Sequence, residues 1–204
     1  MDVNEIQRLL RPFAKLHQKL IELISIYIDL ILKWNARVNL TAVRSPQDIV
    51  QRHFGESFFA ATQLLAAEAA DSVIDLGSGA GFPGVPLAMF TPQTRVTLIE
   101  SNGKKAAFLN EVVRALQLRN VTIFKQRAEN YSGTANLVTL RAVENFSKSA
   151  ELAAGLVAPG GRLALMIGAS QVDVAKAVHP HLAWQPPIPV PESHSRVLLV
   201  GKRT

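Results

Sequence analysis

The spacing of apolar residues divides the chain into two parts with different periodicities. In the first part apolar residues recur every three or four positions, the spacing of one buried helical face. Pro12 falls within this pattern and predicts a break between a short first helix and a long second one. Residues 1–68 are therefore predicted to form a helical extension. Its apolar face comprises Leu9, Phe13, Leu16, Leu20, Ile24, Tyr27, Ile31 and Trp34.

From Ser72 onward, short β-branched runs alternate with longer helical segments. This alternation predicts right-handed crossovers and a largely parallel sheet with helices on both faces. A proline-rich loop precedes the last run, which we expect to be an antiparallel strand at the edge of the sheet. The predicted strands are Val73–Leu76, Arg95–Ile99, Val121–Lys125, Leu137–Leu140, Arg162–Ile167 and Arg196–Val200.

The length and composition fit one α/β domain, residues 69–204, packed with the extension as a single unit. Of the 204 residues, 48% are hydrophobic, which is enough for a substantial core. Cysteine is absent, so disulfides and cysteine nucleophiles are excluded, and a reducing cytoplasm is the expected compartment. The most apolar run, Leu20–Leu32, contains Glu22 and Asp29 and is too short to span a bilayer, so we expect no membrane partner.

A glycine-rich turn follows the first predicted strand and is typical of a nucleotide cofactor site. Glycines at 77, 79 and 81 leave room for a ligand against the backbone, at the strand end where open α/β sheets bind ligands. Gly79, Gly81 and Gly84 also match the spacing of dinucleotide-binding loops.

Two features favour S-adenosylmethionine over a nicotinamide or flavin. The charge of Asp75 would repel a pyrophosphate and attract a sulfonium. Pro83 and Pro86 remove N–H groups that a pyrophosphate would use at the start of the next helix.

Further candidates follow the next three strands. Glu100 is placed to accept the ribose hydroxyls; alternatively, it caps the helix that starts near Asn102. Ala128 would offer its backbone N–H to the adenine. Arg141 lies at the carboxyl edge of the sheet, where cofactor and substrate meet; the alternative is an ion pair with Glu144 or Glu129.

Basic residues are concentrated after the second strand. The formal net charge is +6, and Ser101–Arg127 carries six Lys and Arg against the single acid Glu111. This span is typical of a phosphate-facing patch, although a solvated helix face has the same composition. The histidines are too scattered to predict a metal site.

Several of these motifs together resemble one family, the ribosomal RNA small-subunit methyltransferase G family, also called glucose-inhibited division protein B. The similarity covers about residues 30–168. It is carried by Trp34-Asn35, Asn39-Leu40-Thr41-Ala42-Val43-Arg44, Arg52-His53, the loop Gly77–Ala88, Lys104-Lys105, Phe108-Leu109, Arg127-Ala128-Glu129 and Arg141-Ala142.

The resemblance implies a Rossmann-like fold with a mostly parallel seven-stranded sheet. It also implies methyl transfer from S-adenosylmethionine to N7 of a guanine in the decoding-region loop of 16S rRNA, with free rRNA or the 30S subunit as partner and the protein acting as a monomer. By resemblance, the cofactor contacts are Gly77, Phe82, Ala128, Glu129 and Arg141.

With RNA as the implied partner, basic residues from both parts of the chain could line a groove for it. The candidate RNA contacts are Arg44, Arg52, Lys104, Lys105 and Arg127. We read His53 as a packed or RNA-contacting residue rather than a base.

This chain differs from the family pattern at three positions. Glu56 stands in place of an aspartate, Leu140 in place of a serine, and Ile167 in place of a lysine. The last change keeps a second function open, an S-adenosylmethionine- or RNA-binding module with little catalysis. A third possible function is that of a nicotinamide-dependent oxidoreductase, which the negative charge of Asp75 disfavours.

The expected chemistry needs no general base, because N7 of guanine carries a lone pair and no proton. Catalysis would then depend on positioning and on stabilising the charge that moves onto the purine. Arg141 and Glu129 are the candidate catalytic residues.

Overall fold

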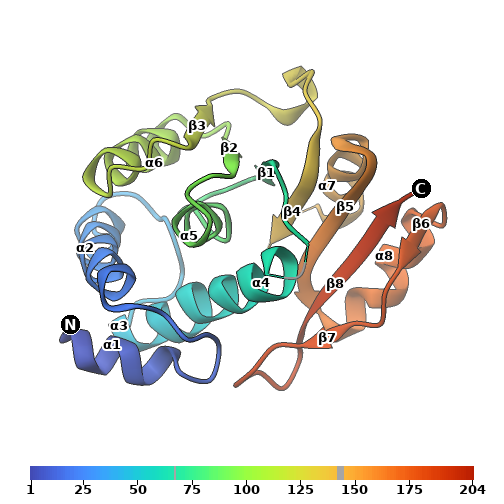
Figure 1. The fold of residues 1–204 in the computed structure, drawn as a ribbon. Coiled ribbons are helices and arrows are strands. Elements are labelled where there is room, and N and C mark those ends of the chain that lie inside the picture. The colour runs from blue at the N-terminus through green and yellow to red at the C-terminus, as the bar shows by residue number, and fades with distance from the viewer. Residues whose placement is uncertain (67, 142–144) are drawn as a thin grey trace.

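The structure is a computed structural model that describes residues 1–66, 68–141 and 145–204. Helices and strands alternate after the helical N-terminal part, as the apolar pattern predicts (Figure 1). The helices are α1 Val3–Leu10, α2 Gln18–Asn35, α3 Pro46–Asp48, the π-helix η1 Ile49–Gly55, α4 Glu56–Leu65, α5 Gly84–Phe90, α6 Gly103–Ala115, the 3-10 helix η2 Ala128–Asn130, α7 Phe146–Gly155, the 3-10 helix η3 Ala169–Gln171 and α8 Val172–Val178. The strands are β1 Ser72–Leu76, β2 Arg95–Ile99, β3 Val121–Phe124, β4 Ala135–Arg141, β5 Val157–Gly168, β6 Leu182–Trp184, β7 Ile188–Pro189 and β8 Arg196–Arg203.

The strands form one mixed sheet in the order β3-β2-β1-β4-β5-β8-β6. The pairs among β1 to β5 are parallel, whereas β8 runs antiparallel to β5. This arrangement confirms the largely parallel α/β sheet and the reversed last strand.

Two details of the predicted sheet are wrong. Within the described residues the sheet has eight strands instead of seven. Strand β8 is not at its edge, because β6 pairs with one end of its outer side and β7 with the other. The prolines at 186 and 187 lie between these two short strands and lack the N–H that a continuous strand would need.

The helices cover the two faces of the sheet with two apolar clusters. One cluster joins α1, α2, α4, α5 and α6 to the sheet, and the other packs α7 and α8 against the opposite face. The first cluster runs without interruption from Ile6 in the extension to Val200 in the last strand. The extension is thus built onto the α/β part through a shared core. None of the described helices is long and apolar enough to cross a membrane.

The helix α2 positions two later parts of the chain. At its end, the buried Asn35 accepts hydrogen bonds from the N–H groups of Leu40 and Thr41, at 2.9 and 3.2 Å, and donates to the Thr41 carbonyl at 3.1 Å. In its middle, the fully buried Tyr27 donates its hydroxyl to the Ala80 carbonyl at 2.5 Å. The long helix therefore shapes the loop at 36–41 and supports the glycine turn from below.

The contact between Tyr27 and the glycine turn leaves no room for a side chain at Gly81. Its φ of +88° lies in the left-handed region, and a Cβ there would be 2.2 Å from the Tyr27 hydroxyl oxygen.

We expect Gly81→Ala to destabilise the protein by about 3 kcal/mol, because it adds backbone strain to a steric clash. For a chain of this size the melting temperature should fall by roughly 10 °C. Gly155→Ala is the matched control, since a Cβ at this position in α7 meets nothing within 4 Å. A Gly81→Ala variant with the melting temperature of the wild type would contradict the described packing.

Candidate cofactor and RNA site

The glycine turn is held against the end of β2 by backbone hydrogen bonds. The N–H groups of Gly77 and Ser78 donate to the Ile99 carbonyl at 2.9 and 3.1 Å. Gly77 and Gly79 have φ values of +68° and +57°, which glycine adopts without strain. The turn therefore presents a bare backbone surface at the carboxyl edge of the sheet.

The carboxylate of Glu100 joins this turn to helix α6. Its Oε2 accepts from the N–H of Gly79 at 2.9 Å, and its Oε1 accepts from the N–H of Asn102 at 2.7 Å. Asn102, in turn, caps α6 through the N–H groups of Lys104 and Lys105. Two carboxylate oxygens offer about four acceptor positions, so the two occupied ones leave two for ribose hydroxyls.

Two cavities open on either side of Glu100. The smaller, about 240 Å³, is lined by Leu76, Gly77, Ile99, Glu100, Ser101, Gln126, Arg127, Ala128, Glu129, Lys148, Ser149 and Leu152. The larger, about 480 Å³, is lined by Asn39, Leu40, Thr41, Ala42, His53, Gly77, Ser78, Gly79, Ala80, Phe82, Glu100, Lys105 and Arg141. Gly77 and Glu100 belong to both, so the two cavities form one divided cleft.

Two residues predicted at the cofactor, Asp75 and Gly81, line neither cavity, and the missing side chain of Gly81 makes room for Tyr27 instead. The carboxylate of Asp75 is 1% exposed beneath the turn, where it accepts from the Thr139 hydroxyl at 2.7 Å and the Gly84 N–H at 3.2 Å. Burial raises the pKa of Asp75 from 3.8 to about 6, although these hydrogen bonds act in the opposite direction. Its attraction for a cationic cofactor stays a prediction and would have to act through the turn rather than by contact.

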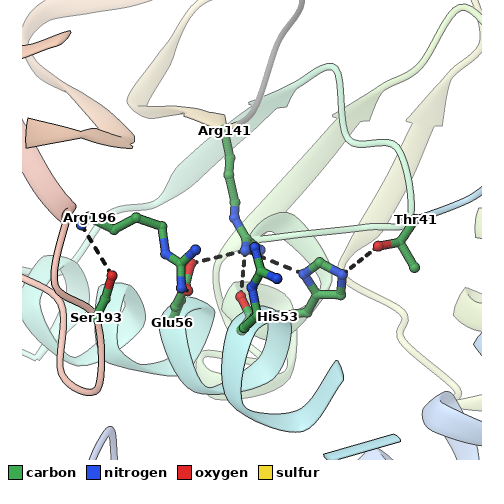
Figure 2. A network of polar contacts seen from close by, with 7 residues as sticks. Thr41, His53, Glu56, Arg141, Ser193 and Arg196 are labelled. Atoms are coloured by element: carbon green, nitrogen blue, oxygen red, sulfur yellow. Dashed lines mark hydrogen bonds and ion pairs between the residues drawn. The ribbon is translucent and has the colours of Figure 1, made fainter. Parts of the chain in front are cut away.

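Arg141 leaves the end of β4 and enters a network of polar contacts from the N-terminal part of the chain (Figure 2). Its Nη2 lies 3.0 Å from Oε2 of Glu56 and 3.3 Å from Nδ1 of His53, and it donates to the Arg52 carbonyl. The other oxygen of Glu56 lies 2.6 Å from Nη2 of Arg196. Glu56 thus bridges two arginines from different strands.

This network differs from the ion pairs considered for Arg141. Glu129 lies 3.6 Å from Lys148 instead, and Glu144 is outside the described residues. Sequence reasoning did not find the pairing with Glu56, which precedes Arg141 by 85 residues. The family motif that contains His53 and Glu56 was the available signal.

His53 is neutral in this setting. Burial, followed by the charges of Arg141 and Arg52, lowers its pKa to about 3. Its ring stacks on Phe82 with centroids 4.9 Å apart, and Phe82 stacks on Tyr27 at 5.5 Å. His53 is therefore a packed residue with both ring nitrogens in contact with neighbours, as its position suggested.

The predicted RNA contacts are only partly brought together. Lys105 and Arg127 each line one of the two cavities, and the exposed Lys104 is adjacent to Lys105 at the start of α6. Arg44 is exposed on the loop after α2 and lines neither cavity. The side chain of Arg52 borders a separate cavity of about 200 Å³ next to Glu56 and Arg196.

Ile167 stands where the family has a lysine, and its surroundings are apolar. It is 5% exposed in β5 and packs in the apolar cluster beneath α7 and α8. The isoleucine thus contributes to the core on that face.

The strand order, the glycine turn after β1 and the divided cleft define the fold of S-adenosylmethionine-dependent methyltransferases. The magnesium protoporphyrin IX methyltransferase of Synechocystis PCC 6803, solved with bound S-adenosylmethionine, superposes with a TM-score of 0.68 at 17% identity and covers 94% of this chain and 99% of that one. Precorrin-6y C5,15-methyltransferase of Geobacter metallireducens GS-15 superposes with a TM-score of 0.55 at 13% identity, covering 71% and 86%.

Sequence comparison identifies the family within this class. The family model "rRNA small subunit methyltransferase G" matches residues 20–185. Ribosomal RNA small subunit methyltransferase G of Roseiflexus sp. (strain RS-1) is 42% identical over 170 residues, or 80% of this chain and 72% of that protein. The corresponding protein of Stenotrophomonas maltophilia (strain K279a) is 41% identical over 157 residues, 76% and 68%. The chain belongs to the rRNA small subunit methyltransferase G family, which confirms the resemblance and makes S-adenosylmethionine its cofactor.

The raised pKa of Asp75 predicts a pH-dependent stability. A buried carboxyl with a higher pKa in the folded chain binds its proton more tightly there, so ionisation destabilises the fold as the pH rises from about 4 to about 6. The shift from 3.8 to about 6 corresponds to about 3 kcal/mol.

Asp75→Asn cannot ionise, so we expect its unfolding free energy, relative to the wild type, to increase by up to about 3 kcal/mol between pH 4 and pH 7. Urea unfolding of both proteins at several pH values measures this difference. A difference that stays constant over this range would show that Asp75 is not a buried, titrating group.

Proposed function

We propose that this protein transfers a methyl group from S-adenosylmethionine to N7 of a guanine in 16S rRNA, free or within the small ribosomal subunit, and that it acts as a cytoplasmic monomer. The observation that carries the proposal is the divided cleft, in which a glycine turn and a fixed arginine adjoin basic side chains. Family membership already makes the protein an rRNA methyltransferase. The atom, the base and the monomeric state are the finer parts of the proposal.

The residues that line the cleft suit S-adenosylmethionine. The smaller cavity would take the adenosine, with the backbone of Ala128 beside the adenine and Glu100 beside the ribose. The larger cavity would take the methionine against Gly79 and Phe82. Gly79 fits this role because a Cβ there would project over the turn with only the Gly77 carbonyl, 3.8 Å away, nearby. When bound, the cofactor supplies an electrophilic methyl on a positively charged sulfur.

Positioning carries the chemistry in this proposal. N7 of guanine attacks without losing a proton, and the low pKa of His53 makes that ring a poor proton acceptor near neutral pH. Arg141 is 12% exposed and held by Glu56, so its guanidinium keeps one orientation at the edge of the larger cavity. It is placed to hold a carboxylate of the cofactor or an oxygen of the RNA in a two-pronged contact.

The alternative, a binding module with little catalysis, arose from the missing lysine at position 167. Ile167 is buried among apolar residues and lines neither cavity, so in this chain the position contributes no polar group to the cleft. Transfer of labelled methyl groups to 30S subunits and to free 16S rRNA decides between the two functions. We expect one modified guanine, located by cleavage at N7-methylguanine; binding of S-adenosylhomocysteine without any methyl transfer would favour the binding module.

Arg141→Lys should lower single-turnover methyl transfer about a hundredfold, because an ammonium cannot reproduce the planar fork and the reacting atoms are then misplaced. Arg162→Lys is the matched control: Arg162 is also buried and paired, with Glu68 at 3.4 Å, but lines neither cavity. Arg162→Lys should lower the free energy of unfolding but leave the rate of methyl transfer unchanged. An Arg141→Lys enzyme with the wild-type rate would make Arg141 a structural ion-pair partner only.

Joint replacement of Lys104 and Lys105 by alanine should weaken binding of 16S rRNA and reduce the salt dependence of the association constant by about two charges. Lys15→Ala with Lys19→Ala removes the same charge from exposed positions near the start of α2 and should leave the salt slope nearly unchanged. Because Lys105 lines the larger cavity, S-adenosylhomocysteine binding is measured alongside. An unchanged slope in the first variant would place the RNA elsewhere.

A further inference from the structure

Part of one sheet face is open near the amino ends of β1, β2 and β3. The connection between β3 and β4 contains only the short 3-10 helix η2, so it places no α-helix over this region (Figure 1). A cavity of about 370 Å³ lies there, and its lining includes Ile74, Thr97 and Thr122, register partners on the three neighbouring strands. This cavity, called here the amino-end cavity, shares no lining residue with the cofactor cleft.

The charged residues that line the amino-end cavity are all basic. Arg95 starts β2 and Arg119 lies two residues before β3; both line the cavity, and no Asp or Glu does. The exposed Asp71 accepts from the N–H of Arg95 through its carbonyl but does not line the cavity. Both arginines are exposed, and neither forms an ion pair within the described residues. Two guanidinium groups without a counter-charge attract an anion.

The backbone that carries the two arginines is fixed. Asn120, the residue after Arg119, donates its side-chain amide to three carbonyls in the segment before β2, the nearest being that of Thr94 at 2.9 Å. Its own carbonyl accepts from the N–H of Val96 at 2.8 Å. The starts of β2 and β3 are thereby tied together, so Arg95 and Arg119 leave neighbouring strands at the same end of the sheet.

A row of basic residues connects the amino-end cavity with the cofactor cleft. Strand β3 is an edge of the sheet; Arg119 precedes it, and Lys125 and Arg127 follow it. All three are exposed, and Arg127 lines the smaller cavity of the cleft. The six residues from Arg119 to Lys125 span roughly 20 Å along an extended strand. One polyanion can therefore follow the edge strand from the cleft to the amino-end cavity.

The phosphate backbone of RNA suits this arrangement. A guanidinium holds a phosphate through two parallel N–H donors, and threonine hydroxyls are common phosphate contacts. At about 3.4 Å per stacked nucleotide, roughly 20 Å corresponds to about six nucleotides. A small phosphorylated molecule would fill the cavity alone and would leave Lys125 and Arg127 without a role in its binding.

We propose that the amino-end cavity binds the phosphate backbone of the rRNA about six nucleotides away from the target guanine, with Arg95 and Arg119 as the phosphate contacts. The inference goes beyond the cleft and rests on the proposed function only in taking rRNA as the ligand. It gives the protein an RNA-binding site on the edge of the sheet opposite to the cofactor.

The test measures equilibrium binding of 16S rRNA over a range of salt concentrations, with S-adenosylhomocysteine present. For Arg95→Ala with Arg119→Ala we expect at least about tenfold weaker binding and a logarithmic salt slope smaller by about 1.5, the effect of two lost phosphate contacts. Arg95→Lys with Arg119→Lys should keep most of the slope, because the charges remain, but bind more weakly without the planar fork. Neither arginine lines the cleft, so S-adenosylhomocysteine should bind both variants as it binds the wild type.

The matched control is Arg8→Ala with Lys19→Ala, which removes two charges from exposed positions of the helical extension. This control should leave both the affinity for rRNA and the salt slope nearly unchanged. A second measurement uses the wild type alone: 16S rRNA should protect Arg95 and Arg119, but not Arg8, from modification by phenylglyoxal.

The outcomes separate this inference from the proposed function. Wild-type affinity and slope in the double alanine variant, an equal loss in the control, or absence of protection by rRNA would each overturn the second RNA site. Protection by inorganic phosphate alone would make the cavity a small-anion site and overturn it as well. A wild type that binds 16S rRNA with both arginines protected, yet transfers no methyl group, would refute the proposed function and support this inference.

Discussion

The site depends on the contacts that the buried carboxylate of Glu56 makes with two arginines. Glu56 begins α4 and lies 3.0 Å from Arg141 of β4 and 2.6 Å from Arg196 of β8. Burial raises the pKa of Glu56 although both arginines lower it, and burial lowers the pKa of Arg141. Desolvation thus opposes the ionic forms of both groups. The main effect of the network is to hold Arg141 in one orientation, because a buried ion pair adds little net stability compared with apolar packing. Removing one member of the pair is nevertheless costly, since the other charge stays buried without a partner.

Fixing Arg141 in this way makes the N-terminal helices part of the site. From Arg141 the contacts continue through His53 to Thr41, and a second route passes from His53 through Phe82 to Tyr27 beneath the glycine turn. A minimal α/β domain would leave the larger cavity open on this side. The extension lines it on this side with Asn39, Leu40, Thr41, Ala42 and His53.

The sequence predicted the local features of the site well and the long-range ones poorly. The glycine turn, Glu100, Ala128 and Arg141 follow strands whose order is a general property of α/β folds, so their meeting at one edge could be expected. Charge and position suggested that Asp75 would face a ligand, but the bonds from Thr139 and Gly84 that turn it inward depend on packing. The pairing of Glu56 with Arg141, the split edge strand and the burial of Ile167 likewise depend on contacts that no local pattern records.

Replacement of Glu56 by glutamine tests the dependence of the site on this carboxylate most directly, with urea unfolding and calorimetric binding of S-adenosylhomocysteine as the two measurements. We expect the free energy of unfolding to fall by about 3 kcal/mol, since two arginines lose their buried counter-charge. S-adenosylhomocysteine should bind at least about tenfold more weakly, or about 1.4 kcal/mol, because Arg141 no longer keeps its orientation. A Glu56→Gln protein with the stability and the affinity of the wild type would contradict it.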